Sequence, residues 1–532
     1  MRPKVGALAG GTGDRVTEMG ARLFRNVRWE SALVRLVLSF CVALVVFGVS
    51  LNFWILNPTH IKWILSTNLD VTTYFFSFAY FRRAAWGFPL AHFDSLSYPI
   101  GTSLLVMDGL PLAAIPLKLF NRFLPDRFQF LGPWVFLNVW LQCFFAERFL
   151  RRLELPSLWR WVGAILATTA PPFMQRFGHV ALSSHWVILL ALASVCSEVP
   201  EAALWFAPIL ALCIHPYLFA MVLALSMTGQ LRFARTPGAL RRVALMAVGL
   251  LGSLWLLGYF QMPETRNGRF EYYSSDLTSL FNSMGSARFL PSRALGDGPS
   301  EGSAYLGCGG LVLCLALLIT LAVPLLRRRS AQIWWLFAAS SAMALYALSI
   351  GVHFLGVVVV RLDFLWPIIE PFASRFRSCG RFIWPLFYYL LFFGLKALHG
   401  LGHGRRWLDF GAPALLALQI ADIWPGLAHK DAQPSFNVTT NVSEVPAEIS
   451  SQLTPDTRLL IFEPPVKTRC GSLVWHGPYQ HLAWFGALHG LKSNANLGEA
   501  RSVKGEGAAE CRYTTDMYRH RAKHPEAIFI RQ

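Results

Sequence analysis

Residues 311–326 read LVLCLALLITLAVPLL, and three arginines follow directly. An uncharged run of this length is typical of a membrane-spanning helix, which needs about 20 mostly apolar residues. Similar runs occur at 42–50 and 387–395. Of the 532 residues, 54% are hydrophobic and 15% are charged, whereas about a quarter of a soluble domain is charged. The composition excludes a soluble enzyme, a secreted disulfide scaffold and a disordered protein, and it predicts a polytopic membrane protein.

The net charge of +18 is concentrated in short basic segments at 2–35, 232–242, 327–329 and 405–406. Short loops rich in Lys and Arg stay in the cytoplasm, so these segments predict a cytoplasmic N-terminus. A nucleic-acid-binding protein would instead carry its basic residues on one continuous soluble face, so nucleic acid is not an expected partner. The long polar tail before the first apolar run argues against a cleavable signal peptide.

The alternation of apolar and basic segments predicts an all-α bundle of about 11–13 spans, which the lipid bilayer would surround. We expect a basic cytoplasmic tail at 1–31 and the transmembrane domain at 32–424. Long external loops are expected at 57–103, 262–304 and 351–379.

From 425 to 532 the composition becomes polar, and short β-like runs appear at 458–462 and 527–530. This region predicts a small soluble α/β domain on the extracytoplasmic side. Of the nine cysteines, Cys470 and Cys511 fall in it. The two thiols either pair in this oxidising compartment or are unrelated. No CxxC pair is present, so no structural zinc site is expected.

Two stretches before residue 121 depart from a simple span. Tyr74, Phe75, Phe78 and Phe81 recur at helical spacing and predict an amphipathic helix in the membrane interface. The run 104–120 contains an aspartate and two prolines, which predicts a broken or re-entrant helix. Such backbone is tolerated at membrane depth only where protein or a water-filled cavity covers it. This segment leaves the span count between 104 and 150 open.

Acidic residues in the external segments are informative, because a carboxylate near the membrane is costly unless it is paired or functional. Asp70 precedes Thr72 and Thr73, so it suits a helix N-cap, and it equally suits a catalytic or metal-binding role. Asp108 lies in the predicted broken helix.

Histidines and arginines in the same segments suggest an anionic ligand. His179 and His185 are too far apart in sequence to share one helical face, so they suit helix capping, phosphate binding or proton transfer better than a metal site. Arginine presents a planar fork that fits phosphate oxygens, although interfacial anchoring would also explain these residues. The external arginines with this potential role are Arg266, Arg269, Arg375, Arg377 and Arg381.

A series of different short motifs is distributed along nearly the whole chain, from about residue 34 onward. Besides Asp70, they are Leu56-Asn57-Pro58-Thr59, Tyr80-Phe81-Arg82, Trp86-Gly87-Phe88-Pro89, Met107-Asp108-Gly109-Leu110-Pro111, Gly178-His179, His185-Trp186, His215-Pro216-Tyr217, Glu301-Gly302, Tyr305-Leu306-Gly307 and Arg377-Ser378-Cys379-Gly380-Arg381-Phe382. On these motifs, the chain resembles a family of uncharacterised bacterial multi-span membrane proteins. That family is similar in layout to the GT-C glycosyltransferases, the integral membrane enzymes that use polyprenyl-phosphate sugars.

The resemblance implies a glycosyltransferase on the outer face of the bacterial inner membrane. It would move a hexose or pentose from a polyprenyl-phosphate donor to an unidentified envelope glycan, lipid or protein acceptor. Asp70 matches the essential acid of the first external loop and would be the base, while Asp108 would position the sugar or the acceptor. The other implied substrate-binding residues are Arg266, Arg269, Arg375, Arg377, Arg381, His179, His185, Glu301 and Tyr305.

No cofactor is firmly expected from the sequence. The stretch 175–185 lacks the second acid of the GT-C pattern, and the chain has no DxD pair of the kind that binds a divalent metal. A divalent metal is therefore left open as a cofactor, but no sequence motif supports it.

Two other functions stay open. One is a polytopic transporter or lipid flippase, although transporters typically contain paired broken helices and this chain shows one such segment. The other is a non-catalytic component of an envelope polysaccharide pathway, in which the interfacial acids would tolerate substitution.

Overall fold

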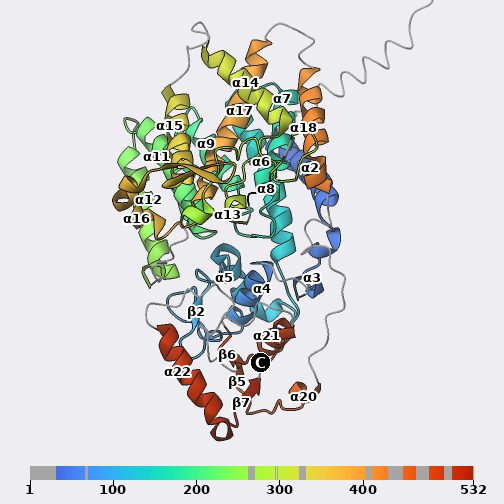
Figure 1. Cartoon of the computed structure of the whole chain (residues 1–532), viewed down its shortest axis with the longest axis vertical. Helices are drawn as coiled ribbons and strands as arrows, with labels where there is room; N and C mark the ends of the chain where they lie inside the picture. Colours follow the sequence, from blue (N-terminus) through green and yellow to red (C-terminus); the bar gives the residue numbers. More distant parts are fainter. Residues whose placement is uncertain are drawn as a thin grey trace, which may run out of the picture.

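The structure, a computed structural model, has three tiers along its long axis (Figure 1). A helical bundle occupies one end, a middle layer contains α3, α4 and α5, and the C-terminal unit occupies the other end. The residues described are 31–65, 70–261, 270–290, 292, 293, 295, 297–322, 331–402, 410–428, 447–462, 478–495 and 506–530.

The bundle consists of helices rich in Leu, Val, Ala and Phe. They are α2 (Ala32–Ser50), α6 (Leu131–Arg152), α7 (Ser157–Thr168), α8 (Pro171–Met174), α9 (Trp186–Val195), α10 (Ala203–Leu212), α11 (Pro216–Arg232), α12 (Ala239–Leu257), α14 (Gly307–Ala322), α15 (Ala331–Ala347), α17 (Trp384–Leu401) and α18 (Gly411–Ala428). Every residue of α9 is buried, which fits its uniformly apolar sequence.

Within the described residues, three helices are long and apolar enough to cross a membrane. They are α2, α12 and the continuous stretch Cys379–Leu401, which includes α17. Shorter apolar helices occur at Trp186–Val195, Ala203–Leu212 and Gly307–Leu321. The predicted mainly helical fold is therefore confirmed, with a few helices able to span a membrane. The larger number of about 11–13 spans stays a prediction.

A buried ionic cluster joins three helices of the bundle. Glu147 of α6 is 1% exposed, and its carboxylate lies 3.4 Å from Nε of Arg35 on α2 and 3.3 Å from Nε of Arg160 on α7. A buried carboxylate needs such partners, because removing one partner of a buried ion pair costs about 3–5 kcal/mol. The cluster therefore fixes the mutual position of the three helices.

The middle layer is formed by residues between α2 and α6. Its elements are η1 (Phe53–Leu56), α3 (Lys62–Leu65), α4 (Asp70–Phe81), the antiparallel strands β1 (His92–Phe93) and β2 (Thr102–Ser103), α5 (Pro111–Leu119) and η2 (Asn121–Phe123). The aromatic spacing correctly predicted a helix at α4. The helix has no exposed face, because all residues from Val71 to Phe81 are buried, and its position relative to the membrane interface stays a prediction.

The predicted break in 104–120 is present. Asp108 and Leu110 have positive φ angles of 51° and 53°, and α5 begins only at Pro111. Gly109 packs so closely on α4 that a Cβ at this position would lie 2.4 Å from the Ser77 hydroxyl oxygen. The turn that carries Asp108 is thus held against α4.

Segments between the later bundle helices form short elements of their own. They are η3 (Tyr259–Gln261), η4 (Glu271–Tyr273), α13 (Asp297–Ser300), the antiparallel hairpin β3 (Gly351–Phe354) and β4 (Val357–Arg361), η6 (Asp363–Leu365), α16 (Trp366–Ala373) and η7 (Cys379–Ile383). The Asp276 carboxylate accepts backbone hydrogen bonds from Leu355 and Gly356, which anchors the turn of the hairpin.

The C-terminal unit contains a three-stranded parallel sheet with strand order β6-β5-β7. Its elements are α20 (Ala447–Ser450), β5 (Leu459–Phe462), α21 (Pro478–Leu488), β6 (Lys492–Ser493), α22 (Glu506–Arg519), η10 (Arg521–Lys523) and β7 (Ala527–Ile530). The β-like runs at 458–462 and 527–530 correspond to β5 and β7. The proposed pairing of Cys470 with Cys511 lies outside the described residues, since Cys470 is not among them.

The C-terminal unit is joined to the middle layer by specific contacts. The Tyr80 hydroxyl of α4 donates a 2.9 Å hydrogen bond to the carbonyl oxygen of Ala483 in α21. Lys492 forms an ion pair with Asp94, and the backbone of Ser493 bonds to residues 95 and 98. Burial of α4 thus follows from its position between the bundle and α21 (Figure 1).

Close packing at Gly486 predicts a stability effect. A Cβ at this position would lie 2.6 Å from the Tyr80 hydroxyl oxygen, so Gly486→Val should force α21 away from α4 at a cost of about 1–3 kcal/mol. We expect a lower thermal midpoint in detergent and faster proteolysis within 447–530. Gly490→Asn is the matched control, because Gly490 has a φ of 67° that Asn tolerates and has no neighbour within 4 Å. Equal behaviour of the two variants would contradict this packing.

Candidate functional site

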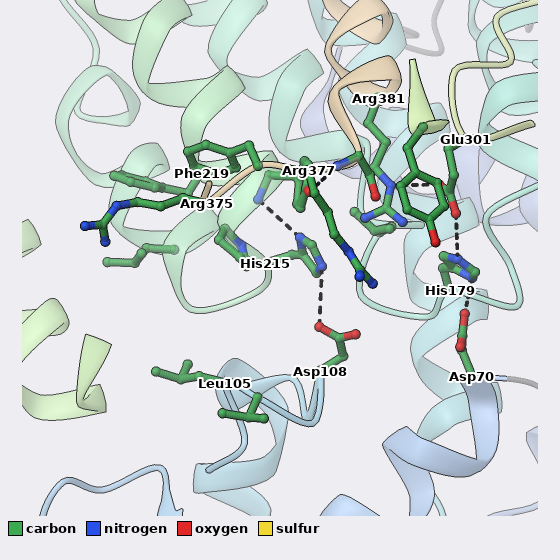
Figure 2. A pocket seen from close by; sticks show the side chains of 18 of the residues that line it. Asp70, Leu105, Asp108, His179, His215, Phe219, Glu301, Arg375, Arg377 and Arg381 are labelled. Atoms are coloured by element: carbon green, nitrogen blue, oxygen red, sulfur yellow. Dashed lines mark hydrogen bonds and ion pairs between the residues drawn. The ribbon is translucent and has the colours of Figure 1, made fainter. Parts of the chain in front are cut away.

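A cavity of about 410 Å³ lies where the bundle meets the middle layer (Figure 2). Its walls come from α4, the turn before α5, the loop after α8, the start of α11, the end of α12 and the segment after α16. The ionisable Asp, Glu, His and Arg side chains that line it are Asp70, Asp108, His179, His215, Glu301, Arg375, Arg377 and Arg381.

The Glu301 carboxylate is the centre of the charged network. Its Oε2 accepts 2.8 Å hydrogen bonds from Arg176 and Arg381, and its Oε1 lies 3.4 Å from Nε2 of His179. Burial would raise the pKa of Glu301, but the two guanidinium groups and His179 hold it well below the usual value. Glu301 is therefore ionised and fixes three segments of the chain relative to one another.

Two glycines explain why these charged groups meet. A Cβ at Gly380 would lie 2.7 Å from the Cα of Gly302, and a Cβ at Gly302 would lie 2.6 Å from the Cα of Ser275. Three backbones therefore approach more closely than side chains would permit. Glu301 and Arg381 are the direct neighbours of these glycines, so the close approach places carboxylate and guanidinium within bonding distance.

His179 connects Glu301 to Asp70. Nδ1 of His179 lies 2.8 Å from Oδ2 of Asp70 (Figure 2). Burial would lower the pKa of His179, but Asp70 and Glu301 together raise it to about 9. Burial would likewise raise the pKa of Asp70, yet His179 lowers it. At neutral pH an imidazolium is thus held between two carboxylates, and Asp70 presents a negative charge to the cavity.

A second pair lies nearer the centre of the cavity. Nδ1 of His215 accepts a 3.2 Å hydrogen bond from the backbone N–H of Tyr217 and so caps the N-terminus of α11. Nε2 of the same ring faces Asp108, with its carboxylate oxygen 3.7 Å away. The Tyr217 hydroxyl in turn accepts from the backbone N–H of Ser378, and the Arg381 guanidinium lies over the Tyr217 ring.

The cavity is lined by both charged and apolar side chains. Figure 2 shows Asp70, His179, Glu301 and Arg381 on one side and Leu105, Phe219 and Arg375 on the other, with Asp108, His215 and Arg377 between them. Leu212, Leu254 and Phe376 also line the cavity. The shape and polarity suit an amphipathic ligand that carries an anionic group.

Most of the predicted site residues meet in this cavity. The structure brings together Asp70, Asp108, His179, Glu301, Arg375, Arg377 and Arg381. Arg266 and Arg269 lie outside the described residues. Two other predicted binding residues do not line the cavity, because each is engaged elsewhere. His185 lies 2.9 Å from the Tyr388 hydroxyl, and the Tyr305 hydroxyl donates a 2.7 Å hydrogen bond to Asp422.

Sequence reasoning missed two members of the site. The stretch 175–185 contains Arg176 and the motif His215-Pro216-Tyr217 contains His215, but the sequence predicts a binding role for neither. The N-cap position of His215, directly before Pro216 at the start of an apolar helix, is a signal that could have indicated a fixed ring orientation. The partner of Arg176 is 125 residues away in sequence, and no local pattern indicates such a pair.

The site residues do not fit a divalent metal. Such an ion prefers several carboxylate and carbonyl oxygens in one place. Asp70 and Glu301 already bond to His179 and to arginines, which compete with a cation. Across the described parts of the chain, no group of three His, Cys, Asp or Glu side chains is placed to hold a metal ion.

The charge on His179 predicts a pH-dependent stability. Its folded-state pKa of about 9 exceeds the ordinary 6.5, so its contribution is fully present below about pH 6.5 and is lost as the pH rises through 9. We expect the thermal midpoint in detergent to fall between about pH 7 and 10, and His179→Gln to have a lower midpoint at pH 7 and a shallower decline. His520→Gln, at an exposed histidine, should match the wild type. Parallel profiles for His179→Gln and wild type would contradict the assignment.

Comparison with known proteins gives a family without a known activity. Residues 38–424 match a family described as "Domain of unknown function (DUF6311)", a range that includes nearly all of the bundle, the middle layer and every residue that lines the cavity. No curated protein matches the chain. Since the match extends over more than half of the sequence, the chain belongs to the DUF6311 family.

Proposed function

We propose that this protein is a GT-C-like membrane glycosyltransferase that uses a polyprenyl-phosphate sugar. The observation that carries the proposal is that Asp70 lines one cavity together with Arg375, Arg377 and Arg381, although they belong to segments far apart in sequence. A one-site transfer needs this arrangement, because the base and the groups that bind the leaving phosphate must reach the same anomeric carbon.

The mixed lining of the cavity supports a lipid-linked donor. The apolar side chains of Leu212, Phe219 and Leu254 suit the first isoprene units of the lipid. Arg377, which extends toward the centre of the cavity in Figure 2, and Arg375, beside Phe219, suit the phosphate, since guanidinium groups bind phosphate oxygens through paired hydrogen bonds. The sugar would then extend toward Asp70.

The reaction follows from these positions. An acceptor hydroxyl attacks the anomeric carbon, the bond between that carbon and the phosphate oxygen breaks, and the polyprenyl phosphate leaves with the electron pair. Asp70 takes the proton of the hydroxyl as that group becomes acidic in the transition state. The arginines stabilise the charge that develops on the phosphate. His179 keeps Asp70 ionised and oriented, and Glu301 holds His179 in place.

The proposal includes a location and partners. The helices able to cross a membrane support a bundle in the lipid bilayer, for which we propose about 11–13 spans in a bacterial inner membrane. The cavity and the C-terminal unit would then be extracytoplasmic, and the N-terminus cytoplasmic. At the outer surface, the enzyme would transfer the sugar of the donor to an envelope glycan, lipid or protein.

Asp70→Asn tests the proposed base. In lipid nanodiscs with a panel of polyprenyl-phosphate hexoses and pentoses, together with envelope glycan and lipid fractions as acceptors, we expect wild type to release free polyprenyl phosphate. The variant should release it at least about 100-fold more slowly, because a general base usually accelerates a reaction by about 100-fold or more. Asp94→Asn is the matched control, because Asp94 lies in the same segment but pairs with Lys492 outside the cavity.

Three outcomes separate the candidate functions. Release by wild type and by Asp94→Asn, but not by Asp70→Asn, supports the enzyme. Equal release by all three overturns Asp70 as the base. Donor binding without release in any of them, combined with movement of donor between leaflets, would instead support the transporter or flippase.

Arg377→Gln tests the proposed phosphate contact. Loss of a charge-assisted hydrogen bond to the donor should raise KM for the donor by about tenfold or more. Arg361→Gln serves as the control, since Arg361 lies on the β3–β4 hairpin and pairs with Glu271 and Asp363. An unchanged KM in Arg377→Gln, at wild-type protein levels, would remove this arginine from the phosphate site.

A further inference from the structure

The helix α16 exposes a row of large apolar side chains that neither the cavity nor packing within the chain accounts for. Ile368 and Phe372 are one turn apart on α16, and Phe364, in η6, precedes Ile368 by the same interval. Their exposed fractions are 70%, 62% and 74%. We call these three residues the α16 stripe. Apolar side chains gathered in this way, and not scattered singly, mark a surface that contacts a membrane or another protein.

A different side of α16 packs on the rest of the protein. Ile369 and Ala373 are also four residues apart, and together with Trp366 they contribute to an apolar cluster around Phe270 and Cys379. This pair is offset by one residue from the exposed pair, which corresponds to a rotation of about 100° around the helix axis. The helix therefore has two apolar sides, and the described part of the chain covers one of them.

The acidic residue of α16 points away from the stripe. Glu370 is exposed, and it is two residues from both Ile368 and Phe372, so it lies about 160° from each of them around the axis. An apolar side opposite a charged side is typical of a helix that lies in the plane of a membrane surface. A helix surrounded by water would instead carry polar residues where the stripe is.

The place of α16 in the chain indicates its depth. Shortly after the helix ends, Cys379 begins the stretch Cys379–Leu401, which is long and apolar enough to cross a membrane. Cys379 also belongs to the cluster on which α16 packs, so the helix is attached to the end of that stretch. Figure 1 shows α16 in the tier of the bundle, away from the C-terminal unit. With the stretch in a bilayer, α16 lies where the acyl chains meet the headgroups.

We infer that the α16 stripe inserts into the outer leaflet of the phospholipid bilayer. The inference rests on the proposed location of the bundle in a membrane, and it is independent of the proposed glycosyl transfer. A second copy of the chain is a poorer occupant, because a stable interface buries about 1,200–2,000 Å² and the stripe offers three side chains on a short helix.

Insertion of the stripe has a consequence for the cavity. Arg375 and Phe376 follow α16 directly in the chain, and both line the cavity. A helix held in the outer leaflet would keep these two residues near the level of the lipid phosphates. A lipid-linked substrate presents its own phosphate at that level.

Photocrosslinking of the full chain in nanodiscs of phosphatidylethanolamine and phosphatidylglycerol tests the contact. p-Benzoylphenylalanine replaces Ile368 or Phe372, and lipid adducts are measured by mass spectrometry after irradiation. The same substitution at Leu251, exposed on α12, is the reference for a spanning helix, and at Tyr513, exposed on α22, the reference for the C-terminal unit. An interfacial helix buries its apolar face about 5–10 Å into the headgroup boundary, so positions 368 and 372 should give at least about tenfold more lipid adduct than position 513.

Hydroxyl-radical labelling of the unsubstituted protein in the same nanodiscs guards against a disturbed fold. Lipid excludes water from an inserted side chain. Phe364 and Phe372 should therefore be oxidised at least about fivefold more slowly than Tyr513, after correction for the intrinsic reactivity of each residue type.

The outcomes separate this inference from the proposed function. If position 251 gives no lipid adduct, the membrane location fails, and this inference fails with it. If position 251 gives adducts but the stripe behaves like Tyr513 in both experiments, the inference alone is overturned. Crosslinks from the stripe to a second copy of the chain, in place of lipid, would also overturn it. Lipid adducts at 368 and 372 without release of polyprenyl phosphate would support the inference and count against the glycosyltransferase.

Discussion

The carboxylate of Glu301, bonded to Arg176 and Arg381, is the interaction on which the cavity depends. The two arginines are buried and the Glu301 side chain is only 13% exposed, so any one of these charges alone would cost several kcal/mol. Together they join the loop after α8, the loop before α14 and the start of η7. The remaining Glu301 oxygen faces His179, which bonds to Asp70. The ionisation of Asp70 thus depends on a network that is assembled from three distant parts of the chain.

The cavity combines different chemistries in its walls. Helices α10, α11 and α12 contribute the apolar side chains Leu212, Phe219 and Leu254, and α4 and the Glu301 network contribute charged ones. His215, which caps α11, and Asp108, in a turn with positive φ, also line it. An amphipathic ligand with an anionic group matches this lining. A polyprenyl-phosphate sugar has these properties, and a transport substrate of the same class would have them too.

Sequence patterns predicted the helical character of the protein and most of the charged residues of the site. Acids and arginines stand out in a chain with few charges, because each is costly near apolar segments. The aromatic spacing predicted α4 but not its burial, since the helix that covers it, α21, lies about 400 residues further along the chain. Long-range contacts also explain the other differences from the prediction. Arg176 bonds to Glu301, far away in sequence, and no local pattern indicates this pair. His185 and Tyr305 form buried hydrogen bonds with Tyr388 and Asp422 instead of lining the cavity.

The length of α4 has a consequence for how this family can vary. Its first residue is Asp70, at the cavity, and its last turn contains Tyr80, which bonds to α21. A helix turns 100° and advances 1.5 Å per residue, so inserting or deleting one residue would rotate one end relative to the other by about that angle. Either Asp70 would leave the cavity or Tyr80 would leave α21. Substitutions on α4 can be accommodated by repacking, but its register cannot change without separating the two ends of the molecule.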